Sequence, residues 1–357
     1  MSMATEAGTR AMALREKVFA ALDKGGRWFD VLGFGWVVPI LKILAGDNPR
    51  EQLKELREKL LIPLLGIAFF LVLWGTLAPQ VKTSLGAIPG PIQVYEQGEA
   101  LWADYVSIRK QETDFYTRQD ARNTAFIESG EPNRVRHFDY TGQPTYIDQI
   151  FTSLRTVGLG FFIATLIAVP LGIASGLSPT FSGALNPLIQ LFKPVSPLAW
   201  LPIVTMIVSA VYVNATDAFP KSLVISAVTV TLCSLWPTLI NTAMGVASID
   251  KDLMNVGKVL QLTTFTTIRK LVLPSALPLI FTGLRLSLSV GWMVLIAAEM
   301  LAQNPGLGKF VWDEFQNGSS NSLARIMVAV LTIGVIGFAL DRIMYAFQSA
   351  FTFQANR

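Results

Sequence analysis

The 357-residue chain is 52% hydrophobic and only 15% charged, with a net charge of +4. Soluble domains carry more charge, so most of this chain is expected to lie in lipid. Its basic residues are scattered, which argues against a nucleic-acid partner. The single cysteine excludes an intrachain disulfide, and the single histidine, His137, has no companions for a metal site, so no metal or cofactor is expected.

The first 59 residues mix acidic and basic side chains and lack the basic start, apolar core and cleavage site of a secretory signal peptide. Residues 31–41 are uncharged but too short to cross a bilayer, which favours an interfacial helix over a deeper segment. Residues 52–59 carry alternating charges at helical spacing, as solvated helices do. Residues 1–59 are therefore expected to form an amphipathic, charged segment ahead of the first span.

Long apolar runs predict six membrane spans. Backbone groups in lipid must be satisfied within each span, so the spans should be helices in an all-α bundle. The third run is short and flanked by prolines, so its start could lie near Leu188. Small residues in the second and fifth spans favour close helix packing. The spans are 60–78, 157–177, 198–213, 223–247, 277–301 and 326–346, and the small residues are Gly158, Gly160, Ala164, Gly172, Gly176, Gly283 and Gly291.

Residues 79–150 form a long hydrophilic insertion between the first two spans. Their composition predicts a charged helix over 101–127 and turns at 86–91, 130–133 and 142–144. We expect a small cap on the bundle, which is either a solvated insertion or a docking surface for a substrate-delivery protein. The core of the membrane domain is expected over 151–350.

Basic residues in the short loops set the orientation. Lys193 and four basic residues of the loop 248–273 fall on the same side as the basic N-terminus. The positive-inside rule therefore places both termini and this loop in the cytoplasm, and the insertion outside.

The loop 248–273 is a polar, basic segment between two apolar runs. Four of its apolar residues repeat at three- and four-residue spacing, which predicts a short amphipathic helix: Leu253, Val256, Val259 and Leu260. Gly257 offers a place where the backbone of a partner can approach closely. Pro274 suits the first turn of the next helix. Such a helix can act as a lever on the adjoining span; the alternative is a helix that lies flat on the bilayer.

This loop resembles the coupling loop of bacterial ABC importer permeases, which reads Glu-Ala-Ala, three residues, Gly, nine residues and Ile-x-Leu-Pro. The Glu-Ala-Ala positions hold Asn255, Val256 and Gly257, and the glycine position holds Gln261. The closing residues are Leu271, Leu273 and Pro274. The Asn-Val-Gly-Lys-Val-Leu wording is similar to the nitrate/nitrite branch of the nitrate, sulfonate and bicarbonate permeases. The resemblance covers roughly 147–351.

The resemblance implies a six-helix permease of the type I, MetI-like kind in the bacterial inner membrane. It implies a dimer of identical chains, cytoplasmic ATP-binding subunits on the coupling helices, and an external binding protein that delivers nitrate or nitrite. Bicarbonate, cyanate, taurine and other sulfonates stay open, because similar permeases carry them. The implied coupling residues are Leu253, Asn255, Val256, Gly257, Val259, Leu260, Gln261 and Pro274.

No enzymatic chemistry is expected in this chain, because Gly308-Lys309 lacks the other residues of a phosphate-binding loop. Candidate path or gate residues lie in the spans. Arg285 lies about 16 Å along its helix from Pro274, where a cation either attracts an anionic substrate or pairs with a neighbouring helix. Glu299 at the outer membrane edge is expected to contact the delivery protein or to close the outer gate.

Trp200 and Pro202 resemble part of the family's Pro-Pro-Leu-Ala-Trp-Leu-Pro run. They are expected either to bend the third span around the path or to anchor it at the interface. Residues 304–308 form a turn-rich segment that resembles the family's Gly-Leu-Gly feature, for which a structural turn is the expected role.

Two other functions remain open from the residues alone. A secondary transporter or channel would need ion-coupling acids inside the spans and broken helices in matched halves. The charges that we identify inside strong spans are Arg285 and, near an edge, Glu299. The acids that a secondary transporter would need are therefore scarce, which disfavours that alternative. A purely structural membrane anchor would leave Arg285 without a role.

Overall fold

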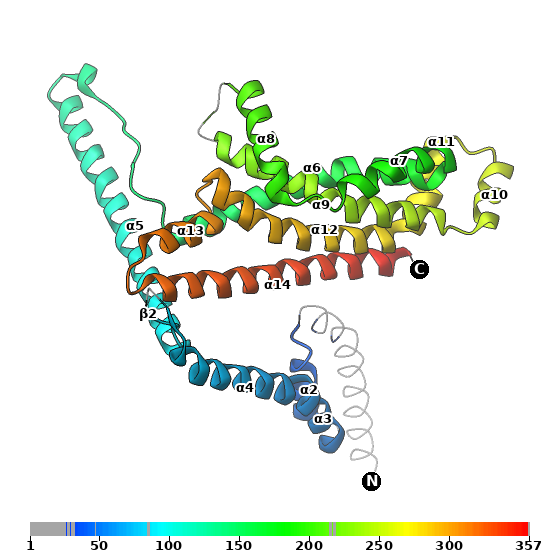
Figure 1. Ribbon diagram of the computed structural model, residues 1–357, viewed down its shortest axis with the longest axis horizontal. Helices are drawn as coiled ribbons and strands as arrows, with labels where there is room; N and C mark the ends of the chain where they lie inside the picture. Colours follow the sequence, from blue (N-terminus) through cyan, green and yellow to red (C-terminus); the bar gives the residue numbers. More distant parts are fainter. Residues whose placement is uncertain are drawn as a thin grey trace, which may run out of the picture.

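The structure is a computed structural model that describes Gly26, Phe29 and residues 33–355, apart from residues 47, 84–85, 214–215 and 217–218. Four long helices lie side by side along one axis (Figure 1): α6 (Tyr146–Leu177), α9 (Lys221–Ala247), α12 (Leu273–Ala302) and α14 (Ser322–Ala355). The named strands of the described residues are β1 (Lys82–Thr83) and β2 (Gly86–Ala87), which pair antiparallel. The predicted all-α membrane fold is confirmed.

The helix α9 is the centre of the bundle. Of its most apolar stretch, 61% of the residues are buried inside the chain, compared with 50% for the helix that contains α12 and 28% for α6. Glycines permit this contact, because a Cβ added at Gly160 would lie 2.8 Å from the carbonyl oxygen of Ala227 on α9. A Cβ at Gly283 of α12 would lie 2.8 Å from the Cβ of Asn241. Close packing is thus confirmed at these glycines, whereas Gly158 faces open space.

Within the described residues, five helices are long and apolar enough to cross a membrane, and a broken pair makes up to six. The pair, α7 (Pro179–Phe192) and α8 (Pro197–Val211), bends by 102° and replaces the predicted straight span at 198–213. The bend has a local cause. The residue before a proline avoids the helical conformation, and the Ser196 hydroxyl accepts the Leu198 N–H at 3.3 Å, which starts a new helix at Pro197.

The first span begins earlier than predicted. The helix Pro49–Gln80 runs through α3 (Pro49–Leu56), a π turn (Arg57–Leu61), α4 (Ile62–Leu77) and a 3-10 turn (Ala78–Gln80). The charged segment 52–59 is therefore the start of the spanning helix. None of its apolar stretch is buried, and α4 diverges from the bundle toward its N-terminal end (Figure 1).

Ahead of it, the short helix α2 (Val37–Leu44) covers part of the predicted interfacial segment 31–41, of which residues 31 and 32 lie outside the described residues.

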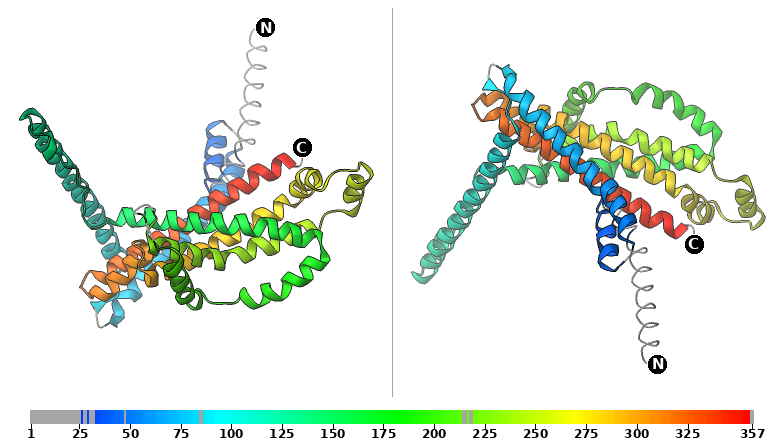
Figure 2. Two further views of the ribbon diagram at one scale, coloured as in Figure 1. Left: turned by 90° about the horizontal axis from the view of Figure 1, so that it is seen from above. Right: turned by 90° about the horizontal axis from the view of Figure 1, so that it is seen from below.

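The insertion forms a long helix rather than a small cap. The helix α5 (Pro91–Glu128) starts before the predicted position 101, because Pro91 suits its first turn and Gln93 accepts the Gly90 N–H at 2.8 Å. A short turn, η3 (Pro132–Arg134), reverses the chain. Beyond its contact with the bundle, α5 projects sideways as an arm (Figures 1 and 2).

Three short elements complete the described fold: α10 (Lys251–Val259), α11 (Thr264–Thr267) with the π turn Ile268–Val272, and α13 (Leu307–Asn317). The helices α10 and α13 lie at opposite ends of the bundle, and α5 adjoins the α13 end (Figure 1). The two candidate regions described next therefore occupy the two ends of α12.

Candidate functional site

The helix α10 presents an apolar face to the outside of the chain. Asp250 accepts the Asp252 N–H at 2.8 Å and so caps the helix. The partly buried Met254 packs with the cluster around Val272, and Gly257 is buried. The opposite apolar side chains are exposed by 36, 51, 81 and 63%: Leu253, Val256, Val259 and Leu260. The predicted amphipathic helix exists, and its apolar side chains are available for another surface.

The end of α10 is fixed by backbone hydrogen bonds. The Gln261 N–H donates to the Lys258 carbonyl and the Leu262 N–H to the Gly257 carbonyl, both at 3.0 Å. This pair of bonds defines a Schellman motif, which needs a left-handed residue at the position of Gln261. Gln261 adopts a φ of 51°, although glycine is the residue that suits it best. The turn after α10 therefore adopts the left-handed conformation although it lacks the glycine of the family motif.

Gly257 does not offer its backbone to a partner, so that expectation is wrong. A Cβ added there would lie 2.9 Å from Cδ1 of Leu271 in the same chain. The glycine instead lets α10 approach the base of α12. Pro274 lies in the first turn of α12, directly after the π turn Ile268–Val272. Because proline has no N–H to donate, the helix is locally irregular where the lever joins the span.

At the opposite end of α12, Glu299 is completely buried. Its carboxylate accepts the Ser153 hydroxyl at 2.8 and 3.0 Å and the Gly308 N–H at 3.0 Å. The Asn304 side-chain amide lies 3.4 Å from the same carboxylate and donates to the Thr156 hydroxyl at 3.1 Å. Glu299 therefore joins α6, α12 and the start of α13, and its burial contradicts a direct contact with a delivery protein.

The Gly-Leu-Gly segment wraps closely around this carboxylate. A Cβ at Gly306 would lie 2.2 Å from Oε1 of Glu299, and a Cβ at Gly308 would lie 2.2 Å from the Ile296 carbonyl oxygen. The Leu307 N–H donates to the Ser153 hydroxyl at 2.8 Å. The first N–H groups of α13 thus point at Ser153 and Glu299, an arrangement that the helix dipole favours. We call Ser153, Glu299, Asn304 and residues 306–308 the Glu299 latch.

Arg285 is paired with an acid. Its Nε and Nη2 donate to the two carboxylate oxygens of Asp341 on α14, at 2.5 and 2.7 Å, and its guanidinium lies 5.2 Å from the ring centre of Tyr345. Arg285 was expected either to attract an anionic substrate or to pair with a neighbouring helix, and this geometry agrees with pairing. The expectation that Arg285 and Glu299 are the charges inside strong spans is wrong, because Asp341 and Arg342 lie within α14.

The remaining path candidates lie near the bend between α7 and α8. The half-buried ring of Trp200 lies 5.8 Å from the ring of Phe192, which also stacks on Trp236 at 6.4 Å. Pro202 is exposed inside α8. The buried Trp200 Nε1 has no hydrogen-bond partner among the residues that the structure describes. Neither residue contributes to the Glu299 latch or to the Arg285–Asp341 pair.

Sequence reasoning missed two partners. The sequence does indicate a role for Asp341, because a carboxylate inside an apolar span needs a cation or a cavity. Ser153 has no such indication, since a serine inside a helix is common and its bond to Glu299 joins residues 146 positions apart.

Comparison with known proteins identifies the family. The family described as binding-protein-dependent transport system inner membrane component matches residues 168–352. The bicarbonate transport system permease protein CmpB of Synechococcus elongatus is 34% identical over 303 residues, which cover 83% of this chain and 92% of the relative. The nitrate import permease protein NrtB of Synechocystis sp. is 30% identical over 309 residues, which cover 85% and 95%.

A chain of the solved MetNI methionine ABC transporter, in an inward-facing conformation, aligns at 16% identity and a TM-score of 0.46 over 56% of this chain and 94% of its own length. The family match spans more than half of the chain, and the two cyanobacterial permeases align along most of it. This chain therefore belongs to the binding-protein-dependent transport system inner membrane components, as an ABC importer permease of the nitrate/bicarbonate family.

Proposed function

We propose that this chain forms the translocation path of an ATP-driven importer for nitrate or nitrite, as a dimer of identical chains. The observation that carries the proposal is the exposed apolar face of α10, which lies away from the bundle at one end of the molecule (Figure 1). A globular protein would bury such side chains, so their exposure fits a docking surface. Permeases of this family work with ATP-binding and substrate-binding subunits.

The coupling role belongs to α10 and its Schellman turn. The ATP-binding subunits would cover Leu253, Val256, Val259 and Leu260, while Gly257 and the π turn join the lever to α12. ATP binding would draw the two coupling helices of the dimer together and turn the bundle outward, and hydrolysis would reset it. ATP hydrolysis belongs to the partner subunits, so this chain moves the substrate without cleaving a bond.

The orientation follows the charge rule, with α10 and both termini in the cytoplasm and α5 outside the cell membrane. The positions of α10 and α5 at opposite ends of the bundle support this arrangement (Figure 1). The Glu299 latch would then lie at the outer end of the path and serve as part of an outer gate.

Bicarbonate is the second candidate substrate, because the similarity to CmpB is as extensive as the similarity to NrtB. Nitrate and bicarbonate are both planar anions with one charge and three oxygens. A permease for one therefore needs little change to carry the other, and cyanate and sulfonates are more distant alternatives. The delivery protein is expected to make most of the selection.

Uptake by the reconstituted complex tests the proposal. The permease is placed in vesicles with its ATP-binding subunit, substrate-binding protein and ATP, and the uptake of labelled nitrate, nitrite and bicarbonate is measured separately. We expect ATP-dependent uptake of nitrate or nitrite. Uptake of bicarbonate but not of nitrate or nitrite would identify bicarbonate as the substrate. Uptake of any anion without ATP or the ATPase would refute the importer mechanism.

One substitution tests the docking surface directly. Val259→Glu places a charge where we expect a buried valine, whose burial contributes about 1.5–3 kcal/mol. Binding of the ATP-binding subunit should weaken about tenfold or more. Lys251→Glu, on the same helix but outside the apolar face, is the control. Equal binding by the Val259→Glu variant would remove this face from the interface.

A further inference from the structure

The outer half of α5 is a separate arm that the bundle supports only at its base. In the part of α5 that precedes Arg109, the buried Leu101 packs with Phe310 of α13 and Ala329 of α14. Beyond Arg109, the helix leaves the bundle and carries the returning segment 135–144 alongside it (Figures 1 and 2). A projecting arm of this kind adds nothing to the bundle core, so its surface requires another explanation.

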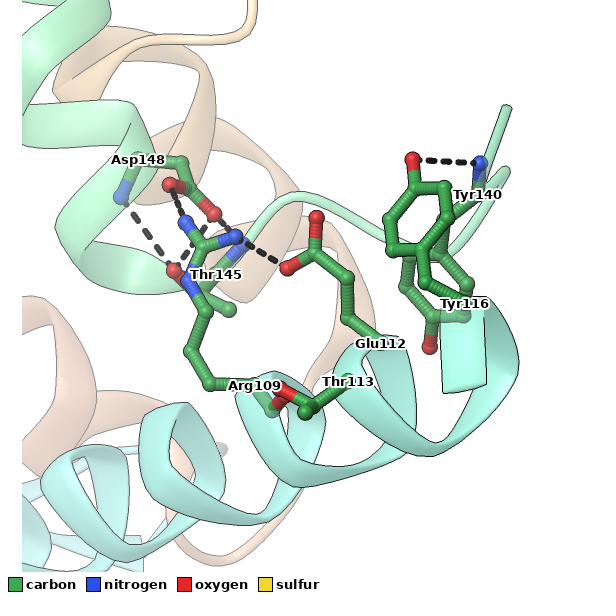
Figure 3. Close-up of polar contacts among 7 residues, drawn as sticks. All are labelled: Arg109, Glu112, Thr113, Tyr116, Tyr140, Thr145 and Asp148. Carbon is green, nitrogen blue, oxygen red and sulfur yellow. Dashed lines mark hydrogen bonds and ion pairs between the residues drawn. The ribbon is translucent and has the colours of Figure 1, made fainter. Parts of the chain in front are cut away.

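The base of the arm is held by ion pairs. Arg109 binds Glu112 at 2.5 Å and also contacts Asp148, whose other oxygen accepts the Thr145 N–H and hydroxyl at the start of α6 (Figure 3). Glu112 first, and then Asp148, raise the pKa of Arg109, so its guanidinium stays charged. On the other side, Arg325 of α14 lies 3.5 Å from Asp104.

The tip of the arm is held by a ladder of side-chain hydrogen bonds. Gln119 accepts the Phe138 N–H at 2.7 Å and donates to its carbonyl at 3.3 Å. Asn123 makes the same two bonds with Arg136, at 3.4 and 2.9 Å, and the Tyr116 hydroxyl accepts the Tyr140 N–H at 3.2 Å (Figure 3).

The spacing of this ladder matches the helix to the returning segment. Four helical residues rise about 6 Å, close to the length of two extended residues, so the two segments stay in register. The returning segment is thereby fixed, although it forms no strand.

Beside this ladder lies a hollow of about 300 Å³, lined by Phe115, Arg118, Gln119, Arg122 and Phe138. The Arg122 guanidinium lies 5.9 Å from the ring centre of Phe138, and Nε of Arg118 donates to the Asp114 carbonyl at 3.1 Å. Neither guanidinium forms an ion pair with a carboxylate of the described chain. Two exposed cations one helical turn apart thus line one hollow together with two phenyl rings.

We propose that this hollow receives an acidic side chain, Asp or Glu, from the surface of the substrate-delivery protein. The two guanidinium groups supply forked donors that match a carboxylate, and the phenyl rings can cover its apolar stem. A protein partner fits better than a lipid surface, because the hollow is concave and its walls are aromatic. The inference rests on the proposed function, which places α5 on the side where the delivery protein arrives.

The test measures ATP hydrolysis by the complete transporter in vesicles of neutral lipid as its own substrate-loaded delivery protein is added. Arg118→Glu/Arg122→Glu should raise the half-saturating concentration of that protein about tenfold at low salt and leave the maximal rate unchanged. Arg118→Gln/Arg122→Gln should give a smaller shift in the same direction. Unchanged basal hydrolysis and co-purification of the ATPase show that each variant is folded and assembled.

Lys82→Glu/Lys110→Glu is the matched control, because it makes the same change in charge at two exposed positions outside the hollow. An equal shift in this control would reduce the effect to general electrostatics and overturn the proposal. An unchanged half-saturating concentration would also overturn it, as would a shift that occurs only with anionic lipid. A wild-type complex that ignores its delivery protein would contradict the proposed function as well.

Discussion

Arg285 and Asp341 form a bidentate pair between α12 and α14, with Arg285 in the half of α12 that follows Leu273. Their side chains are 36% and 26% exposed in the single chain. The arginine therefore enters the membrane with its counter-charge, which explains how a cation is tolerated there. A pair of this kind specifies how two helices meet, whereas an arginine that attracts substrate would need a vacant guanidinium.

Single and double substitutions separate these roles. Arg285→Gln and Asp341→Asn should each destabilise the protein by roughly 2 kcal/mol, less than for a fully buried pair, because each leaves one charge uncompensated. The double variant should regain stability and uptake relative to either single variant. Thermal unfolding and anion uptake are measured together. A double variant as inactive as Arg285→Gln, beside a fully active Asp341→Asn, would assign the arginine to the path.

At the scale of elements, the Glu299 latch joins three helices through one carboxylate. The end of α12 and the start of α13 approach so closely that glycine is required at 306 and 308. Glu299 accepts N–H and hydroxyl donors at both of its oxygens. Glutamine at this position would therefore place the NH2 group, itself a donor, opposite two other donors. Any opening at this end of the bundle must therefore break or move these contacts together.

The latch predicts a strong effect from a single methyl group. Gly308→Ala places a Cβ 2.2 Å from the Ile296 backbone oxygen, which cannot rotate away. The substitution should destabilise the chain by about 1–3 kcal/mol and impair uptake. Gly334→Ala on α14, where no atom lies within 4 Å of the new Cβ, is the control and should be neutral or slightly stabilising. Equal unfolding temperatures for both variants would contradict the close contact between Gly308 and the Ile296 carbonyl.

The elements also show what the sequence could reveal. Lipid requires long apolar helices, so α6, α9, α12 and α14 could be located from hydropathy alone. The prolines of the third span predict a bend, but hydropathy does not give the position of the break between α7 and α8, because each half resembles part of one apolar run and the bend depends on where Ser196 and Pro197 start a new helix. The α10 segment was recognised from local spacing. The bond between Ser153 and Glu299 joins residues too distant for any local pattern.

On the scale of the whole molecule, α10 and the α5 arm lie at opposite ends, so a single orientation test locates both (Figure 1). Cys233 lies in α9 and is replaced by serine to give a cysteine-free background. In intact cells, a membrane-impermeant maleimide should label Lys110→Cys and should reach Lys258→Cys only after permeabilisation. Both sites are exposed, so access depends on the side of the membrane. The reverse pattern would invert the proposed topology.

The leading helix is the least buried of the described membrane spans. Its described contacts include the Trp74 indole, which donates to the Pro89 carbonyl at 3.1 Å, but α4 contains no buried side chain. Exchanging this helix for an unrelated membrane anchor would consequently disturb no buried side chain of α4, and its main effect on the core would fall on the pocket that Leu71 and Trp74 line with α5 and α14. The front of the chain is thus the natural place for a purification handle or a transplanted anchor.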